Sequence, residues 1–276
     1  MPVARAEPLP ASAEPVVPAL PVRPALVEAT NVALPASPQV APPAATPRSD
    51  PPSASDHELP LYRTLIPPPI RVRYTLRRGA LQGSADFEWS PDGERYEAHL
   101  EGRLAGVSVL TQASQGGFDE SGVAPLRFTD RRGAGALQAA NFQREAGKIS
   151  FSGPSVQYPL LMGSQDRLSW MVQLAAVLAA EPQRLADGGK VVIHVIGARG
   201  DSSVWVFRFV GMETLTAGAG TIETAHFARE ATDPYDTRVD VWIDPLRHHL
   251  PARALLRSGP DDEGLELTVQ EPVAVP

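Results

Sequence analysis

From Ile70 onward, the chain consists of short segments that alternate apolar and polar residues and are separated by turns rich in Gly, Pro and Asp. A period of two is typical of strands that bury one face, and short turns favour antiparallel hairpins over parallel strands joined by helices. The segments are IRVRYTL (70–76), GSADFEWS (83–90), ERYEAHLEG (94–102), GVSVLTQASQG (106–116), PLRFTDRRG (125–133), ALQAANFQRE (136–145), KISFSG (148–153), KVVIHVIG (190–197), SSVWVFRFVGMETLT (202–216), GTIETAHFARE (220–230), TRVDVWID (237–244), LPARALLRS (250–258) and GLELTVQE (264–271). We therefore expect a mainly β fold with an antiparallel sheet of about 12 strands.

One segment, DRLSWMVQLAAVLAA, breaks this alternation. Asp166 is an N-cap candidate, good helix formers follow it, and Pro182 is a stop signal. Between Leu168 and Ala180 only Ser169 and Gln173 are polar, so a helix over about residues 167–180 must be buried on most of its surface. Many antiparallel strands and one apolar helix pack most simply as a strongly curved sheet, or incomplete β-barrel, whose concave face the helix covers.

The N-terminal part of the chain has a different composition, since 18 of the 29 prolines lie in the first 69 residues. Proline has no N–H donor and fixes φ, and with almost no aromatic residues nothing offsets the entropy of ordering the backbone. We expect residues 1–66 to be a disordered Pro/Ala-rich spacer and residues 67–276 to form a single β-rich domain. No segment resembles a signal peptide or a transmembrane helix, so a membrane anchor before the spacer is a hypothesis.

Charge and the absence of cysteine exclude several classes of protein. The net charge of −7 divides into −2 for the spacer and −5 for the domain, whereas nucleic-acid binding requires a basic face. Without cysteine there is no disulfide, no thiolate nucleophile and no cysteine-bound zinc. No complete dinucleotide or phosphate-binding motif is present. We expect no nucleic-acid partner and no cofactor.

Histidines and carboxylates are scattered, and the stretch DVWIDPLRHHLPARALL (240–256) holds the densest group. Adjacent residues of an extended chain point to opposite sides, so His248 and His249 are not expected to share a metal, and we interpret them as a solvated turn between two strands. His194 has apolar neighbours and is interpreted as a core histidine with satisfied ring nitrogens. No spacing typical of a metal site or of a serine nucleophile is present, so no catalytic or metal-binding residue is assigned.

Large apolar side chains offer another kind of site. Trp205, Phe207 and Phe209 share one face of an expected strand, and the buried helix lies opposite. The candidates for lining an apolar cavity between the sheet and the helix are Trp170, Leu174, Trp205, Phe207, Phe209 and Trp242. Such a cavity would hold an acyl chain or another hydrophobic ligand. The alternative is a core that these side chains fill themselves.

Four short motifs occur in order near the C-terminus, and they are Gly211–Thr214, the glycine turn 218–220, Val239–Trp242 and Leu250–Arg253. Their Gly-Glu-Thr-like, Gly-centred, Val-x-x-Trp and Leu-Pro-Ala-Arg patterns resemble the bacterial family labelled domain of unknown function 3108 (DUF3108). The resemblance covers roughly residues 70–270. The order of strands and helix is also similar to the lipoprotein carriers LolA and LolB, which are open barrels with a helical plug over an apolar cavity.

The family resemblance implies a location in the bacterial cell envelope, facing the periplasm, usually behind an N-terminal anchor or export signal. We therefore expect a non-enzymatic envelope module that binds a hydrophobic small molecule or lipid, or an envelope protein, and that meets the membrane only through an anchor outside the given chain. One alternative is a pure protein-interaction or structural domain with a self-filled core. A second alternative is a hydrolase that uses scattered His and carboxylate side chains.

Overall fold

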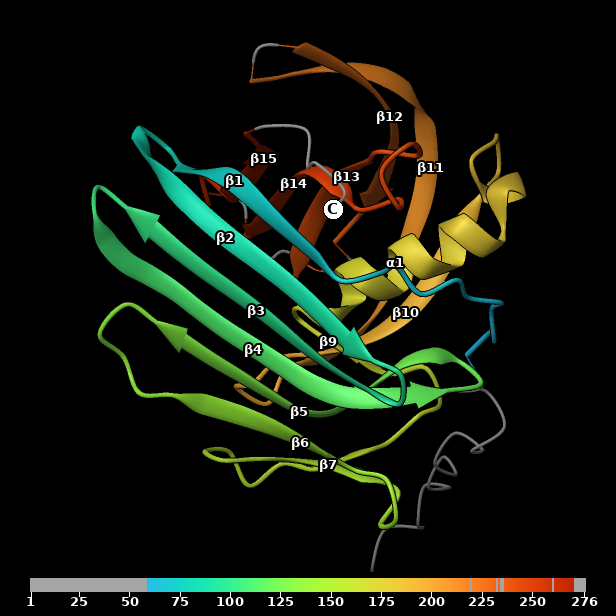
Figure 1. The fold of residues 1–276 in the computed structure, drawn as a ribbon. Helices are drawn as coiled ribbons and strands as arrows, with labels where there is room; N and C mark the ends of the chain where they lie inside the picture. Colours follow the sequence, from blue (N-terminus) through green and yellow to red (C-terminus); the bar gives the residue numbers. More distant parts are fainter. Residues whose placement is uncertain (1–58, 219, 232, 234–235, 260, 271–276) are drawn as a thin grey trace, which may run out of the picture. The chain divides into compact units, whose positions relative to one another are not determined.

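The computed structural model describes residues 59–218, 220–231, 233, 236–259 and 261–270. Within them, a single sheet of 15 strands curls round on itself, and the α-helix lies beside β10 and β11 (Figure 1). The prediction of a mainly β, curved and open antiparallel sheet with one buried helix is confirmed.

The first half of the sheet consists of β1 (Ile70–Arg78), β2 (Leu81–Asp92), β3 (Arg95–Leu104), β4 (Val107–Asp119), β5 (Gly122–Arg132), β6 (Gln138–Gln143), β7 (Lys148–Phe151) and β8 (Tyr158–Pro159). The second half consists of β9 (Gln165–Asp166), β10 (Lys190–Ile196), β11 (Ser202–Ala217), β12 (Gly220–Arg229), β13 (Thr237–Ile243), β14 (Pro251–Ser258) and β15 (Leu265–Val269). The helix α1 (Ser169–Ala180) and the 3-10 turn η2 (Pro182–Arg184) lie between β9 and β10.

The strand order is that of two meanders joined in the middle of the sheet. Strands β1 to β8 are neighbours in sequence order, as are β9 to β15, and β1 pairs with β15. The sheet edges are therefore β8 and β9, and all pairs are antiparallel except β9 with β10. Each predicted segment overlaps one strand. The count of about 12 falls short of 15 chiefly because β8 and β9, with two residues each, are too short to show an alternation.

The helix begins at Ser169 and its residues as far as Leu178 are buried, as its apolar sequence requires. Asp166 lies before the helix and accepts hydrogen bonds from backbone N–H groups at its start. One carboxylate oxygen accepts the N–H groups of Leu168 (2.8 Å) and Ser169 (2.7 Å), while Leu168 occupies the N-cap position. The predicted capping function is therefore present, with the cap residue two positions later than expected.

Two glutamines satisfy backbone groups of β5 where no strand pairs with them. Strand β5 pairs with β6 only through its residues 127–130, which leaves the start of β5 open on that side. The Gln173 side chain accepts the N–H of Val123 (2.9 Å) and donates to the carbonyl of Ser121 (2.6 Å), while Gln165 donates to the carbonyl of Val123 (2.6 Å). The side-chain amides thus take the place of a neighbouring strand.

Residues 59–66, which the sequence assigns to the disordered spacer, pack against the domain. Tyr62 is only 8% exposed and belongs to the hydrophobic core. Its hydroxyl accepts the N–H of Val192 at 2.9 Å. The packed chain therefore includes residues 59–66 instead of starting at residue 67; residues 1–58, with His57, lie outside the described residues. Within the described part of the chain, no helix has the length and apolar character to span a bilayer.

Candidate functional site

The predicted cavity lining from the helix and β11 forms a close-packed aromatic cluster. The ring centroids of Trp170 and Phe207 are 5.2 Å apart in a stacked arrangement, and Trp205 lies 5.7 and 5.9 Å from them. All three residues are at most 1% exposed, and Leu174 is fully buried. These side chains occupy the space that a ligand would need, because interior side chains pack at the density of an organic crystal.

The other two candidates lie elsewhere. Phe209 is partly buried and meets the Phe227 ring edge-on at 5.5 Å. Trp242 is on the opposite face of the sheet, because the neighbouring residues Val241 and Ile243 are the ones that join the core. The strand pattern itself contained this signal, since alternation separates Trp242 from its apolar neighbours.

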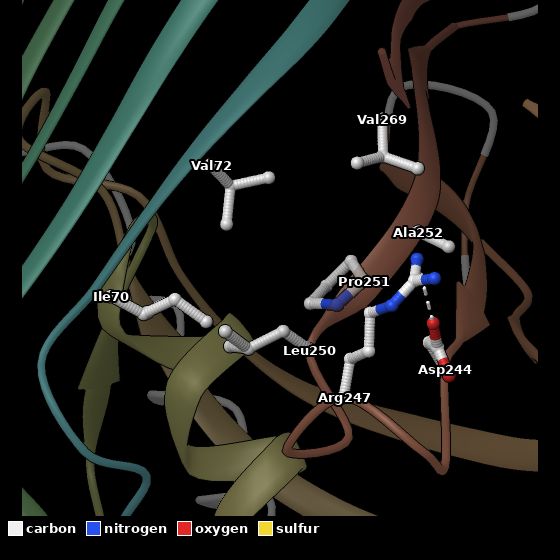
Figure 2. A pocket seen from close by; sticks show the side chains of 8 residues that line it. All are labelled: Ile70, Val72, Asp244, Arg247, Leu250, Pro251, Ala252 and Val269. Atoms are coloured by element: carbon white, nitrogen blue, oxygen red, sulfur yellow. Dashed lines mark ion pairs between the residues drawn. The ribbon is translucent and has the colours of Figure 1, made fainter. Parts of the chain in front are cut away.

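A small apolar cavity lies between the starts of β1 and β14 (Figure 2). Figure 2 shows Ile70 and Val72 of β1 facing Leu250 and Pro251, with the ion pair between Asp244 and Arg247 (3.4 Å) beside them. The cavity volume is about 20 Å³, which holds about one water molecule. None of the six predicted lining residues contributes to it. An acyl chain does not fit this cavity in the described conformation.

Trp242 is the centre of a polar group on the outer face of β11–β14, which we call the Trp242 cluster: Glu213, His226, Asp240, Trp242 and Arg253. The indole N–H of Trp242 donates to Glu213 Oε2 at 2.7 Å. The His226 ring stacks on the indole with centroids 4.4 Å apart and planes at 9°. The Arg253 guanidinium lies 4.4 Å from the ring centroid, and it comes from β14, on the other side of β13 from β12. The indole is therefore held between a histidine and an arginine.

His226 bridges two carboxylates. Its Nδ1 lies 2.8 Å from Glu213 Oε1 and its Nε2 lies 3.1 Å from Asp240 Oδ1. Burial is the largest single effect on its pKa and acts to lower it, but the hydrogen bonds and charges of the two carboxylates outweigh burial and raise the pKa of His226. The Trp242 N–H lowers the pKa of Glu213, and the His226 hydrogen bond lowers that of Asp240. The network favours a charged imidazole between two carboxylates.

The Trp242 cluster connects neighbouring strands of the sheet through side-chain contacts. Arg253 also forms an ion pair with Glu266 (2.6 Å), and Asp240 with Arg257 (3.3 Å), so opposite charges face one another across β12–β15. Among the described residues, no group of three His, Cys, Asp or Glu side chains could hold a metal ion. Three of the four motifs that carry the family resemblance meet here, through Glu213, Trp242 and Arg253. Sequence reasoning missed this convergence because it depends on the register of four strands.

Three further histidines, His194, His248 and His249, are buried or half-buried in the domain. His194 is bonded through both ring nitrogens, to Ser164 Oγ and Ser202 Oγ at 2.8 Å each, which confirms the interpretation as a satisfied core histidine. Burial lowers its pKa to about 4. The expected turn at His248 and His249 is present, but both residues have left-handed φ values (53° and 57°) and are half-buried, whereas solvated side chains were expected. Burial lowers the pKa of His249.

Comparison with known proteins gives a match to one family model and a similarity to solved structures. The family model described as "Protein of unknown function (DUF3108)" matches residues 70–264. Among solved structures, the chain is similar to a beta-barrel-like protein of domain of unknown function DUF1849 from Brucella abortus, with 13% identity and a TM-score of 0.48 over 79% of this chain and 100% of that chain. No curated protein matches the sequence.

Proposed function

This chain belongs to the DUF3108 family, whose function is unknown, and from that premise we propose that it is a non-enzymatic module of the bacterial cell envelope that binds a protein partner on its surface. The alternative of a hydrophobic ligand carried in the core has less support. The proposal concerns the domain of residues 59–270.

The observation that carries the proposal is the self-filled core. Trp170, Trp205 and Phe207, which would have to line a ligand cavity, pack ring against ring and are at most 1% exposed. A drug-sized or acyl ligand occupies about 300–1,000 Å³, far more than the cavity of about 20 Å³ beside Leu250. We therefore assign binding to the surface of the domain.

A non-enzymatic role is supported by the surroundings of the histidines. A general base works best with a pKa near the working pH, whereas burial lowers the pKa of His194 to about 4. Within the described residues, both His194 nitrogens contact serine hydroxyls and neither contacts a carboxylate. Both His226 nitrogens contact carboxylates, and within the part of the chain that the structure describes neither contacts a hydroxyl group that it could activate as a nucleophile. An assay of the purified chain against ester, amide and phosphate substrates should show no turnover.

The first experiment asks what the purified full chain carries. Native mass spectrometry should give the mass of the polypeptide alone, and organic extraction should release no stoichiometric lipid. An acyl species at about one per chain would contradict the self-filled core and support the carrier alternative.

The second experiment looks for the partner in living cells. A photo-crosslinking residue is placed at three exposed positions, Leu65, Val107 and Leu246, which are 62%, 65% and 92% exposed. We expect a crosslinked protein of defined mass from at least one position and from cells fractionated as envelope. Crosslinks that are absent from all three positions, or a chain found only in the cytoplasm, would contradict the proposal.

A further inference from the structure

Residues 59–66, which we call the strap, lie in a groove that the rest of the domain builds. One wall of the groove is the edge of β10. Strand β9 pairs only with Val195 and Ile196, so within the described residues the stretch Lys190–His194 has no strand neighbour on that side. Edge backbone groups of this kind are ready to pair with an extended chain.

Side chains occupy this edge in place of a strand. The hydroxyl of Tyr62 accepts the N–H of Val192 (2.9 Å), and Arg184 donates to the carbonyl of Lys190 (2.7 Å). The Arg184 guanidinium also lies 4.5 Å from the centre of the Tyr62 ring. The tyrosine is therefore recognised twice, through its hydroxyl and through its ring.

The other wall of the groove is helix α1 and its C-terminal end. The backbone N–H of Arg63 donates to Glu181 Oε1 (2.9 Å), and the N–H of Leu65 donates to the carbonyl of Ala176 (2.9 Å). Glu181 is held in place by Arg184, which donates to its second oxygen at 2.7 Å. The groove thus recognises the backbone of an extended segment as well as its tyrosine.

Two features indicate that the strap is exchangeable. Two of its outward side chains are apolar and exposed, Leu61 at 54% and Leu65 at 62%, with the exposed Arg63 between them, and it forms no ladder of backbone bonds with β10. An incoming segment whose tyrosine takes the place of Tyr62 can make the same contacts with Val192 and Arg184. Three consecutive prolines, 67–69, separate the strap from β1 and disfavour any continuous strand or helix between them.

We propose that the protein partner binds in this groove through an extended segment that contains a tyrosine and apolar residues. The strap occupies the groove until the partner displaces it. The inference rests on the proposed partner-binding function and deepens it. The ligand class follows from what the groove already holds, the sequence LPLYRTLI.

The test uses the full chain and a fluorescent peptide of residues 59–66. Leu65→Pro removes the N–H that holds the strap to Ala176 without touching a buried side chain. Leu61→Pro is the matched control, because within the described residues the N–H of Leu61 donates to no other group. We expect the peptide to bind the Leu65→Pro chain at least about tenfold more tightly than wild type or the control, since a competing strap lowers the fraction of open groove.

A second peptide, with phenylalanine in place of tyrosine, checks the recognition of the hydroxyl. It should bind about two- to tenfold more weakly, the value of one hydrogen bond, and only the tyrosine peptide should slow amide exchange at Val192. Equal affinity for all three chains, or no binding to a folded Leu65→Pro chain, would overturn the groove assignment. The assignment would also be overturned if the Leu65→Pro chain formed a dimer that the peptide dissociates. That result would mean that the groove binds the strap of a second copy of the chain. A crosslinked partner that persists in any of these cases would leave the proposed function standing.

Discussion

Gln173→Leu tests how the curved sheet is closed beside the helix. The Gln173 amide makes two bonds at the start of β5: it accepts from Val123 at 2.9 Å and donates to the carbonyl of Ser121, the residue before the strand, at 2.6 Å. Leucine is apolar, somewhat smaller than glutamine and has a good helix propensity, but it can make neither bond. The substitution therefore leaves one buried N–H and one buried C=O without their partners.

The expected loss follows from the cost of unsatisfied buried groups. Each costs about 1–3 kcal/mol, and the added apolar surface of leucine offsets about 1 kcal/mol of the total. The net loss in the free energy of unfolding is about 3 kcal/mol. For a domain of this size, 1 kcal/mol corresponds to about 2–4 °C in Tm, so Gln173→Leu should melt roughly 6–12 °C below wild type.

Thermal unfolding followed by circular dichroism measures this loss, and amide exchange at Val123 locates it. Gln82→Leu, at an exposed position of β2, is the matched control and should stay within about 0.5 kcal/mol of wild type. If Gln173→Leu melts together with the control, or if the Val123 amide exchanges as slowly as in wild type, side-chain closure of β5 is refuted.

Three further predictions concern stability. Leu174→Asp places a charge at a fully buried helix position and should abolish cooperative unfolding; a variant with wild-type Tm would refute the helix packing. Burial raises the pKa of Asp166 to about 6, against the hydrogen bonds that its carboxylate accepts. This raised pKa means that the folded state holds the proton more tightly, so stability should fall by about 3 kcal/mol as the pH rises from about 4 to 6; Asp166→Asn should remove that slope in denaturant titrations. Although burial alone lowers the pKa of His226, its two carboxylates raise it, so its contribution is complete below pH about 6.5 and is lost as pH rises through the folded-state pKa. NMR titration of the imidazole should give a pKa above that of a free histidine, and His226→Gln should lose the corresponding pH dependence.

The alternation of apolar and polar residues was sufficient to predict the long strands and the buried helix. The period of two in 94–102 is also the burial pattern of β3, because a strand with one face in the core repeats its environment every second residue. The apolar sequence around Leu174 likewise has one stable location, inside the sheet. These features depend on local sequence alone.

Features that depend on register could not be predicted. A shift of one residue moves every later side chain to the other face of a strand, and the register shifts between Phe209 and Gly211 and again between Trp242 and Ile243. Glu213 and Trp242 are 29 residues apart in sequence, and only the paired strands bring them together. The convergence of Glu213 and Trp242 in the Trp242 cluster was missed for this reason.

The packing of Tyr62 against the domain could not be predicted from the sequence for another reason. The composition of the first 69 residues is dominated by proline and alanine, and an average over the segment conceals a short apolar stretch at its end. The residues 59–66 include three leucines, an isoleucine and a tyrosine, enough to pack on a neighbouring surface although too few to fold alone. Average composition therefore describes the first 58 residues and residues 59–66 as one segment, although the two differ in sequence.

Side chains cover the start of β5 and the edge of β10, and the two covering side chains line one small cavity. Gln173 covers the start of β5, Tyr62 covers the edge of β10, and the two residues line the same small cavity together with Ser121 and Val192. Groups that share a cavity couple by about 0.5–3 kcal/mol in double-mutant cycles. Gln173→Leu should therefore loosen the strap as well as β5, and should raise the affinity for the 59–66 peptide, whereas Gln82→Leu should not. Strictly additive effects of Gln173→Leu and Tyr62→Phe on stability would show that the two edges are covered independently.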